Sequence, residues 1–300
     1  MQNLIEITGL TQDLLIYLAI DLTIAILLLG AMRFVSGLSA GVNTKEELAQ
    51  KDNFAFGISL AGSIAALGIV LTGAITGETA SSYLMEIIGM FAYGLYGLIL
   101  IKVGRIIHDK IALQKIDKTA LIKEQNLTIG LVDAAGAIAT AIIIRAVLLW
   151  VDGLDLNTFI AITSGFIVAQ TMLVLVTRLK EKQYASNNQE DSLQEALKNG
   201  QLALAIRYSG QVISTALAVT AASHFLTYSP ETLVMNLLGW LVFGIIMTLL
   251  VSILTSIAKR IVLMGINLVE EVDQQHNVGV ASIEMAISIS IALILTALMA

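Results

Sequence analysis

Residues 51–74 read KDNFAFGISLAGSIAALGIVLTGA, and the part that follows Asn53 carries no charged side chain. At 1.5 Å per residue, a helix of this length crosses the hydrocarbon core of a bilayer, which is about 30 Å thick. A second run, NLTIGLVDAAGAIATAIIIRA at 126–146, is apolar apart from Asp133 and Arg145. Both runs therefore predict transmembrane helices.

The composition of the whole chain agrees with a membrane protein. Of its 300 residues, 57% are apolar and 13% are charged, and the mean hydropathy is +0.85. A soluble domain has about a quarter of its residues charged, so this chain has too few to cover a surface that faces water. It has no Cys, which excludes disulfides, iron–sulfur clusters, thiol catalysis and zinc sites that use Cys.

Apolar runs of spanning length recur along the chain. The fold class that we predict is all-α, a polytopic membrane bundle of about eight transmembrane helices arranged as two parallel four-helix repeats. The predicted spans are 12–34, 54–76, 84–107, 127–151, 157–178, 202–226, 233–257 and 278–299.

An internal repeat follows from motifs that recur in the same order. Two predicted capping boxes, Thr44-Lys-Glu-Glu47 and Ser192-Leu-Gln-Glu195, lie 148 residues apart. Further pairs at offsets of 148 to 151 are Gly62 with Gly210, Gly89 with Gly239, Gly94 with Gly244, Asn126 with Asn277, and Asp133 with Glu284. The predicted repeats are 1–152 and 153–300. Four spans in each copy give the two repeats the same orientation in the membrane.

The cations predict the topology. All 17 Lys and Arg residues except Arg145 and Arg207 lie in alternate connections or at their margins, in the ranges 33–51, 102–123, 178–198 and 259–260. The other connections hold no Lys or Arg, and their charged residues are the acids Glu78, Asp152, Asp155 and Glu231. The positive-inside rule then predicts a multi-pass protein with both termini outside the cytoplasm.

Two kinds of segment are predicted at the cytoplasmic surface. Each capping box predicts a short interfacial helix that leads into the second span of its repeat. Segment 109–125 mixes lysines with Ile111, Leu113, Ile116 and Leu121. We expect it to lie on the cytoplasmic leaflet with its lysines toward anionic head groups.

The stretches quoted above resemble the domain of unknown function 350 family of small inner-membrane proteins, in two tandem copies. The resemblance covers 45–148 well and 195–300 more weakly, and in the second copy Arg207 and Tyr208 replace Ser59 and Leu60. The resemblance implies a bacterial inner membrane and partners linked to envelope stress. It implies no catalytic chemistry.

Five ionisable residues inside the predicted spans are candidate functional residues: Asp133, Glu284, Arg207, Asp21 and Arg145. Each costs about 2.5–3.5 kcal/mol near the centre of a span, so each needs a partner or a role. One interpretation is structural ion pairs, with Asp21 and Arg145 forming an outer pair and Arg207 reaching the cytoplasmic surface. The other is that Asp133 and Glu284 line one polar cavity, binding a cation or moving protons, with Arg207 beside them. Arg207, Gln211, Ser214 and Thr215 share a helix face that would line it.

Small residues predict close helix packing rather than a pore lining. The predicted packing positions are Gly57, Ala61, Gly62, Gly89, Gly94, Gly210, Gly239 and Gly244.

No motif indicates catalysis, and the three isolated His residues predict no metal site or cofactor. We therefore do not expect an enzyme, although a membrane-embedded enzyme is the third hypothesis for function. The first is a small transporter or ion or proton conduit that uses the carboxylates between the repeats. The second is a membrane anchor or scaffold that recruits cytoplasmic partners through its basic loops. The expected partners are the lipid bilayer, a further copy of the chain and such a cytoplasmic protein, and no nucleic acid.

Overall fold

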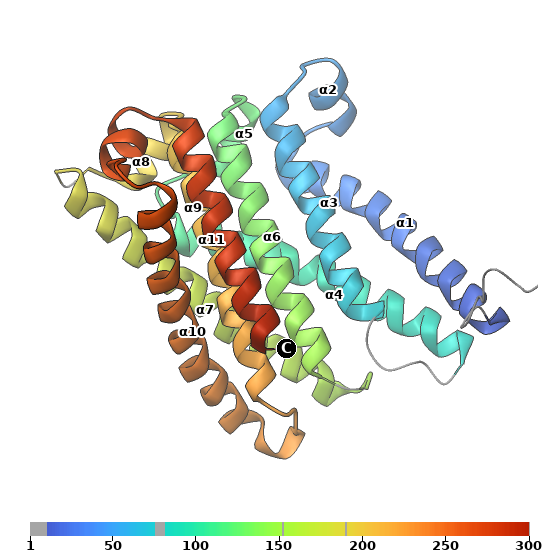
Figure 1. Ribbon diagram of the computed structural model, residues 1–300. Coiled ribbons are helices and arrows are strands. Elements are labelled where there is room, and N and C mark those ends of the chain that lie inside the picture. Colours follow the sequence, from blue (N-terminus) through green and yellow to red (C-terminus); the bar gives the residue numbers. More distant parts are fainter. Residues whose placement is uncertain (1–10, 76–81, 152, 190, 300) are drawn as a thin grey trace, which may run out of the picture.

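Long helices dominate the computed structural model, which describes residues 11–75, 82–151, 153–189 and 191–299 (Figure 1). Within these residues eight helices are long and apolar enough to cross a membrane. They are α1 (Gln12–Ala40), α3 (Phe54–Ile75), α4 (Tyr83–Ile107), α6 (Leu127–Trp150), α7 (Leu156–Asn187), α9 (Leu202–Ala221), α10 (Leu233–Val262) and α11 (Val278–Met299). The predicted all-α bundle of eight spans is confirmed. Glu78 and Asp152 lie outside the described residues.

Polar residues set the ends of the long helices. The Thr11 hydroxyl caps α1 by accepting the Leu14 N–H, and Asn126 caps α6 by accepting the Ile129 N–H, both at 3.2 Å. Gly41 ends α1 with φ of +60°, the left-handed conformation that glycine adopts readily. Pro230 opens the short helix η3 (Pro230–Thr232) before α10, where its missing N–H leaves no bond unmade.

The short helices α2 (Thr44–Ala49), α5 (Lys118–Lys123) and α8 (Leu193–Lys198) lie at one end of the bundle (Figure 1). We call this the basic end, because its connections carry most of the lysines outside the spans. The predicted capping at α2 is wrong in detail, because Asn43 rather than Thr44 caps this helix, accepting the Lys45 N–H at 3.0 Å. Ser192 does precede α8, but its hydroxyl caps no N–H.

The prediction that segment 109–125 rests on the leaflet is wrong for several of its residues. The π-helical turn η1 (His108–Ala112) and α5 fold back against the spans, so Leu113, Ile116 and Ile122 are buried in the core. Lys118 is 3% exposed and points into the bundle instead of toward head groups. Leu113 and Ile116 are therefore core positions, whereas Ile111 and the lysines Lys110, Lys115 and Lys123 are exposed.

The core is a row of four helices in the order α3, α6, α9 and α11. These are the second and fourth spans of the two repeats, and α6 and α9, at the junction between the repeats, are the most deeply buried spans. The helices α1, α4, α7 and α10 pack on the outside of this row. Because the repeats follow one another along the row, α3 and α11 are its two ends.

In each repeat, the closest contact between two helices occurs at the equivalent position. At Gly62 the backbone of α3 lies against Ala134 of α6, and at Gly210 the backbone of α9 lies against Met285 of α11. A Cβ at Gly210 would come within 2.7 Å of the Met285 Cα, so only glycine permits this approach. Ala134 and Met285 are equivalent at the offset of 151, which gives the predicted repeat a structural counterpart.

Other predicted packing positions differ. Gly94 packs against Leu28, Gly239 against Leu226, and Gly244 against Met172 and Val219. Gly89, where a Cβ would meet no atom within 4 Å, and Ala61, which is exposed, pack against no other helix among the described residues of the chain. Gly57 contacts only Leu48 of α2. Spacing alone cannot tell which small-residue face of a helix meets a neighbour.

Candidate functional site

A buried ion cluster surrounds Asp133 in the first repeat. This residue of α6 is 1% exposed. Its Oδ2 accepts hydrogen bonds from the Arg105 guanidinium of α4, at 2.6 Å, and from the Ser59 hydroxyl of α3. The Lys118 ammonium lies 3.7 Å from Oδ1 and forms an ion pair with Asp109. Two cations and two carboxylates therefore balance one another in this cluster.

The same cluster reaches the second repeat through His108. Lys118 donates to the His108 Nδ1 at 2.8 Å, because an ammonium group can only donate. The His108 Nε2 then carries the hydrogen and bonds to the Tyr208 hydroxyl of α9 at 2.7 Å. Both rings are buried. A continuous polar chain thus joins Asp109, Lys118, His108 and Tyr208.

Glu284 has an equivalent cluster in the second repeat. It is 3% exposed and accepts from the Arg207 Nε at 2.6 Å and the Lys259 Nζ at 2.9 Å. Arg207 also binds the carboxylate of Asp273, in the π-helical turn η4 (Val269–Gln274), and the Leu268 carbonyl. The Asn188 amide donates to Asp273 at 3.0 Å. Here too the two carboxylates are balanced by two cations.

The predicted single cavity shared by Asp133, Glu284 and Arg207 is therefore wrong. Arg207 belongs to Glu284, while Asp133 binds Arg105 and Lys118. Each acid faces the third and second spans of its own repeat, as equivalent positions in a repeat must. Counting along the spans could predict the depth of the acids but not the direction in which they point.

The predicted outer pair of Asp21 and Arg145 is also wrong. The Arg145 Nε donates to the Thr72 hydroxyl of α3 at 3.0 Å. Asp21 is 8% exposed, faces the Glu86 carboxyl of α4, and has no hydrogen-bond partner for its Oδ1 among the described residues.

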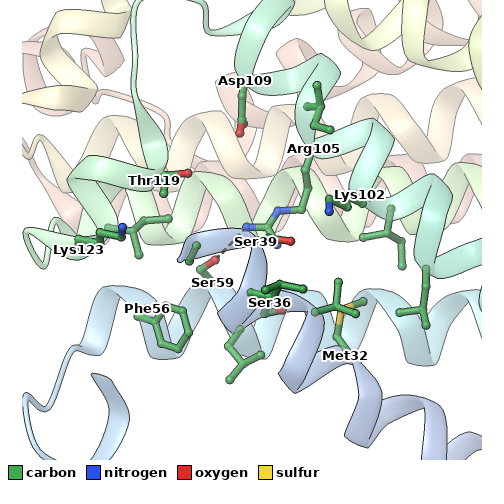
Figure 2. A pocket seen from close by; sticks show the side chains of 18 of the residues that line it. Met32, Ser36, Ser39, Phe56, Ser59, Lys102, Arg105, Asp109, Thr119 and Lys123 are labelled. Carbon is green, nitrogen blue, oxygen red and sulfur yellow. Dashed lines mark hydrogen bonds between the residues drawn. The ribbon is translucent and has the colours of Figure 1, made fainter. Parts of the chain in front are cut away.

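A cavity of about 450 Å³ opens at the basic end of the first repeat, between α1, α3, α4 and α5 (Figure 2). Lys102, Arg105 and Lys123 line it together with the hydroxyls of Ser36, Ser39, Ser59 and Thr119. The Ser36 Oγ is buried without a hydrogen-bond partner in the described part of the chain. Met32 and Phe56 form part of its apolar wall.

The second repeat has a cavity of about 360 Å³ in the equivalent place, between α7, α9 and α10. Four cations line it, Lys180, Arg207, Lys259 and Arg260, with the carboxylates of Asp273 and Glu284.

A second polar cavity adjoins this one further along α10. It is smaller, about 80 Å³, and shares Lys180, Gln211, Ser256 and Lys259 with the larger one. Its remaining polar lining consists of hydroxyls, from Ser214, Thr215, Thr248, Ser252, Thr255 and Ser288. We call the two adjoining cavities the polar passage. The stripe of Arg207, Gln211, Ser214 and Thr215 predicted from helical spacing lines it.

Two hydroxyls deep in the polar passage have no partner. Thr248 Oγ1 and Thr255 Oγ1 are buried and unbonded within the described residues. Thr248 lies eleven residues before Lys259 on α10, or about 16 Å along the helix axis. A volume of 80 Å³ holds water molecules, which could bond to both hydroxyls.

Sequence reasoning missed Arg105, Lys118, Lys259 and Asp273 as members of the two clusters. Arg105 lies in the last turn of the predicted span 84–107, and a cation at that position is a signal that the sequence does offer. Lys118 and Asp273 reach their partners from connecting segments, and no local pattern indicates this. In the described residues, no group of three or more His, Asp or Glu side chains has the arrangement of a metal site.

Comparison with known proteins agrees with the repeat. The family described as Domain of Unknown Function (DUF350) matches twice, at residues 7–148 and 153–299. The chain matches no curated protein and no solved structure. The two matches cover nearly all of the chain and give each repeat one copy of the domain. This polytopic membrane protein therefore belongs to the DUF350 family and contains two tandem copies of its domain.

Proposed function

We propose that the protein is a small transporter or ion conduit whose pathway is the polar passage of the second repeat. The observation that carries this proposal is a pair of adjoining polar cavities, which share four lining residues and reach from the basic end to Thr248. Polar side chains inside a membrane bundle normally bind one another or line a pathway for water and solutes. Thr248 and Thr255 have no such partner among the described residues, which favours a pathway over simple helix packing.

The charges at the mouth of the passage favour an anion. Four cations line the larger cavity against the two carboxylates of Asp273 and Glu284. Such an excess of positive charge raises the local concentration of anions. Further in, the hydroxyls of Thr248 and Thr255 can donate hydrogen bonds to an anion that has lost part of its water. By the positive-inside rule this mouth opens to the cytoplasm of a bacterial inner membrane.

Glu284 is the proposed gate. Its carboxylate accepts hydrogen bonds from the Arg207 Nε at 2.6 Å and the Lys259 Nζ at 2.9 Å. It therefore fills the place that an entering anion would take. An anion that displaces Glu284 would gain the two cations, and the return of Glu284 would release the anion. Asp133 and Glu284 do not act together in this proposal, because each is neutralised within its own repeat.

Flux into liposomes tests the proposal. The purified protein is reconstituted, and uptake of chloride, phosphate and small carboxylates is compared with uptake of sodium and potassium. We expect anion uptake above that of empty liposomes, and a severalfold loss in Thr255→Val and Thr248→Val. The matched control is Thr171→Val, because Thr171 is exposed and bonds only its own helix, at the Ile167 carbonyl. Anion uptake equal to that of empty liposomes, or unchanged by both passage variants, contradicts the proposal.

A membrane anchor that recruits an acidic cytoplasmic protein is a second candidate. It is favoured by the exposed lysines Lys110, Lys115 and Lys123 at the basic end, whereas the buried Lys118 is out of reach. We expect a soluble partner, such as one linked to envelope stress, to co-purify with the chain. It should be lost when these three lysines are changed to Gln, and a chain that captures nothing excludes this function.

A further inference from the structure

In the row of core helices, second and fourth spans alternate and pack on one another. The outer faces of the two end helices lack such a neighbour in the described chain. Within each repeat the second span packs on the fourth, α3 on α6 and α9 on α11. Between the repeats the fourth span of the first packs on the second span of the next, α6 on α9. At the two ends of the row, no described helix packs on α11 as α9 packs on α6, and none packs on α3 as α6 packs on α9.

One face of α6 meets α9. The sides of α6 toward α3 and α4 are fixed by Ala134, which contacts Gly62, and by Asp133, which binds Arg105. The side toward α7 is fixed by Thr140, which accepts a hydrogen bond from Gln170. Ile142 and Ala146 line a cavity together with Leu217 and Thr220 of α9, which places them on the side of α6 toward α9. From one end to the other this face holds Thr128, Leu131, Ala135, Ala139, Ile142 and Ala146, all buried or half-buried.

The equivalent face of α11 is open. At the offset of 151 its residues are Gly279, Ser282, Ala286, Ser290, Leu293 and Ala297, and every one of them is exposed. Five of these six residues are glycine, alanine or serine.

The complementary face of α3 is open as well. On α9 the face toward α6 holds Ala205, Ser209, Ile213, Ala216 and Thr220, because the opposite faces meet α11 at Gly210 and α10 at Trp240. At the offset of 148 the residues on α3 are Gly57, Ala61, Ala65, Gly68 and Thr72, which are exposed or half-buried. A Cβ at Gly68 would meet no described atom within 4 Å.

These open faces carry more small residues than the sides of the bundle that suit lipid, although Leu293 and the neighbouring Ile283 and Ile294 of α11 are also exposed. The outer face of α10 exposes large apolar side chains such as Leu238, Val242, Leu249 and Ile253. Small residues in a span allow another helix backbone to approach closely, and they are typical of helix–helix contacts. Bulky apolar side chains would cover acyl chains equally well, so small ones on both end faces indicate a helix as the neighbour.

We propose that α3 of one chain packs against α11 of a second copy of the chain, reproducing the contact that α9 makes with α6. Such an interface is heterologous, since two different faces meet, and it builds a head-to-tail assembly of repeats. The Asn126 side chain bonds to the Lys198 carbonyl at 2.8 Å, which aligns the starts of α6 and α9 and places Ala135 level with Ser209. The same register places Ala286 of one chain level with Ala61 of the next.

Disulfide cross-linking tests this interface, and the absence of natural Cys removes any background. Chains with Ala61→Cys and chains with Ala286→Cys carry different tags and are expressed together in one membrane. We expect a cross-linked dimer that contains both tags, and none when either variant is expressed alone. The pairing of Ala61→Cys with Leu249→Cys, on the outer face of α10, is the matched negative control.

An intramolecular control tests whether a disulfide can form across the contact between α6 and α9, on which the proposed interface is based. The double variant Ala135→Cys with Ser209→Cys should close within one chain. If this bond forms while Ala61→Cys and Ala286→Cys link no better than the Leu249→Cys pair, the proposed interface is wrong. Links between two Ala61→Cys chains also contradict it, because they require like faces to meet.

A bulky side chain gives a second measurement. Ser290→Trp on α11 should reduce the Ala61–Ala286 cross-link severalfold and release single chains from the detergent-solubilised assembly. Leu249→Trp, on the outer face of α10, should change neither result. A cross-link and an assembly mass that Ser290→Trp leaves intact would overturn the proposal, whatever the outcome of the flux measurements.

Discussion

Arg207 occupies in the second repeat the position that Ser59 has in the first, and each binds the equivalent carboxylate of the fourth span. Ser59 donates its hydroxyl to Asp133, and Arg207 donates its guanidinium to Glu284 at 2.6 Å. The second cation needed in the first repeat comes from Lys118 of α5. In the second repeat Arg207 supplies the second cation from within the span, and the carboxylate of Asp273 balances its charge. One charge balance is thus reached by two routes.

Removing Arg207 should destabilise the second repeat strongly. Arg207→Gln leaves Asp273 without a cation and Glu284 with only Lys259. Breaking a buried ion pair from one side costs about 3–5 kcal/mol. We expect a corresponding fall in the free energy of unfolding in detergent, whereas Arg260→Gln, an exposed cation of the same helix bundle, should change it little. Equal stability of the two variants would show that the cluster is solvated.

Lys118 should be needed for folding rather than for contact with lipid. Lys118→Met keeps the length of the side chain but leaves Asp109 and the His108 Nδ1 without their partner. We expect a loss of about 3–5 kcal/mol in unfolding free energy. Lys115→Met, exposed in the same segment, is the control. If Lys115→Met instead lowered stability and weakened binding to anionic vesicles while Lys118→Met did neither, the segment would lie on the leaflet.

Stability should fall in acid partly through Glu47, which lies outside the spans. Hydrogen bonds from Lys51, at 2.9 Å, and from Asn53 hold the pKa of Glu47 below its ordinary value of 4.5, although burial opposes them. A lowered pKa in the folded state means that Glu47 stabilises the fold above pH 4.5 and loses this contribution as the pH falls through the folded pKa. We expect Glu47→Gln to lower stability near neutral pH and to remove part of the acid dependence.

The measurement is the unfolding midpoint between about pH 3 and pH 7, because this range brackets the titration of carboxylates. Glu195→Gln, an exposed glutamate in α8, should run parallel to the unmodified chain. A Glu47→Gln curve that also runs parallel to it would exclude the contribution of Glu47.

Two glycines should respond to alanine with opposite signs. In Gly62→Ala the new methyl group meets Ala134 of α6, and overpacking of this kind costs about 1–3 kcal/mol. In Gly89→Ala the methyl group meets nothing, and the better helix former should add up to about 1 kcal/mol. Thermal unfolding of both variants in one detergent checks the difference. Equal effects would mean that α3 and α6 are not in close contact.

Hydropathy could predict the spans because a helix in lipid has no other way to satisfy its backbone. The burial of Asp133 and Glu284 could also be predicted, since a lone carboxylate that faces lipid is too costly. Their partners could not. Lys118 and Asp273 come from connecting segments that fold back into the bundle, and such contacts leave no period in the sequence.

The sequence also cannot predict the direction in which the buried acids and the small residues point. The offset of 151 fixes Asp133 and Glu284 at one depth, but their common position in the repeat turns each toward its own neighbours rather than toward the other. Likewise the small residues of α3 form two faces. The face of Gly62 meets α6, and the face of Gly57 and Ala61 does not. Only the arrangement of the repeats in a row decides which face is covered.

The polar passage is the central claim, and labelling of single cysteines tests it most directly. Thr255→Cys is treated with a charged, membrane-impermeant thiol reagent from the side of the basic loops, with Thr171→Cys, which faces outward, as the control. The account predicts rapid labelling of Thr255→Cys, slowed by small anions, and none of Thr171→Cys. Labelling of neither residue, with both chains folded, would contradict a water-filled path into the second repeat.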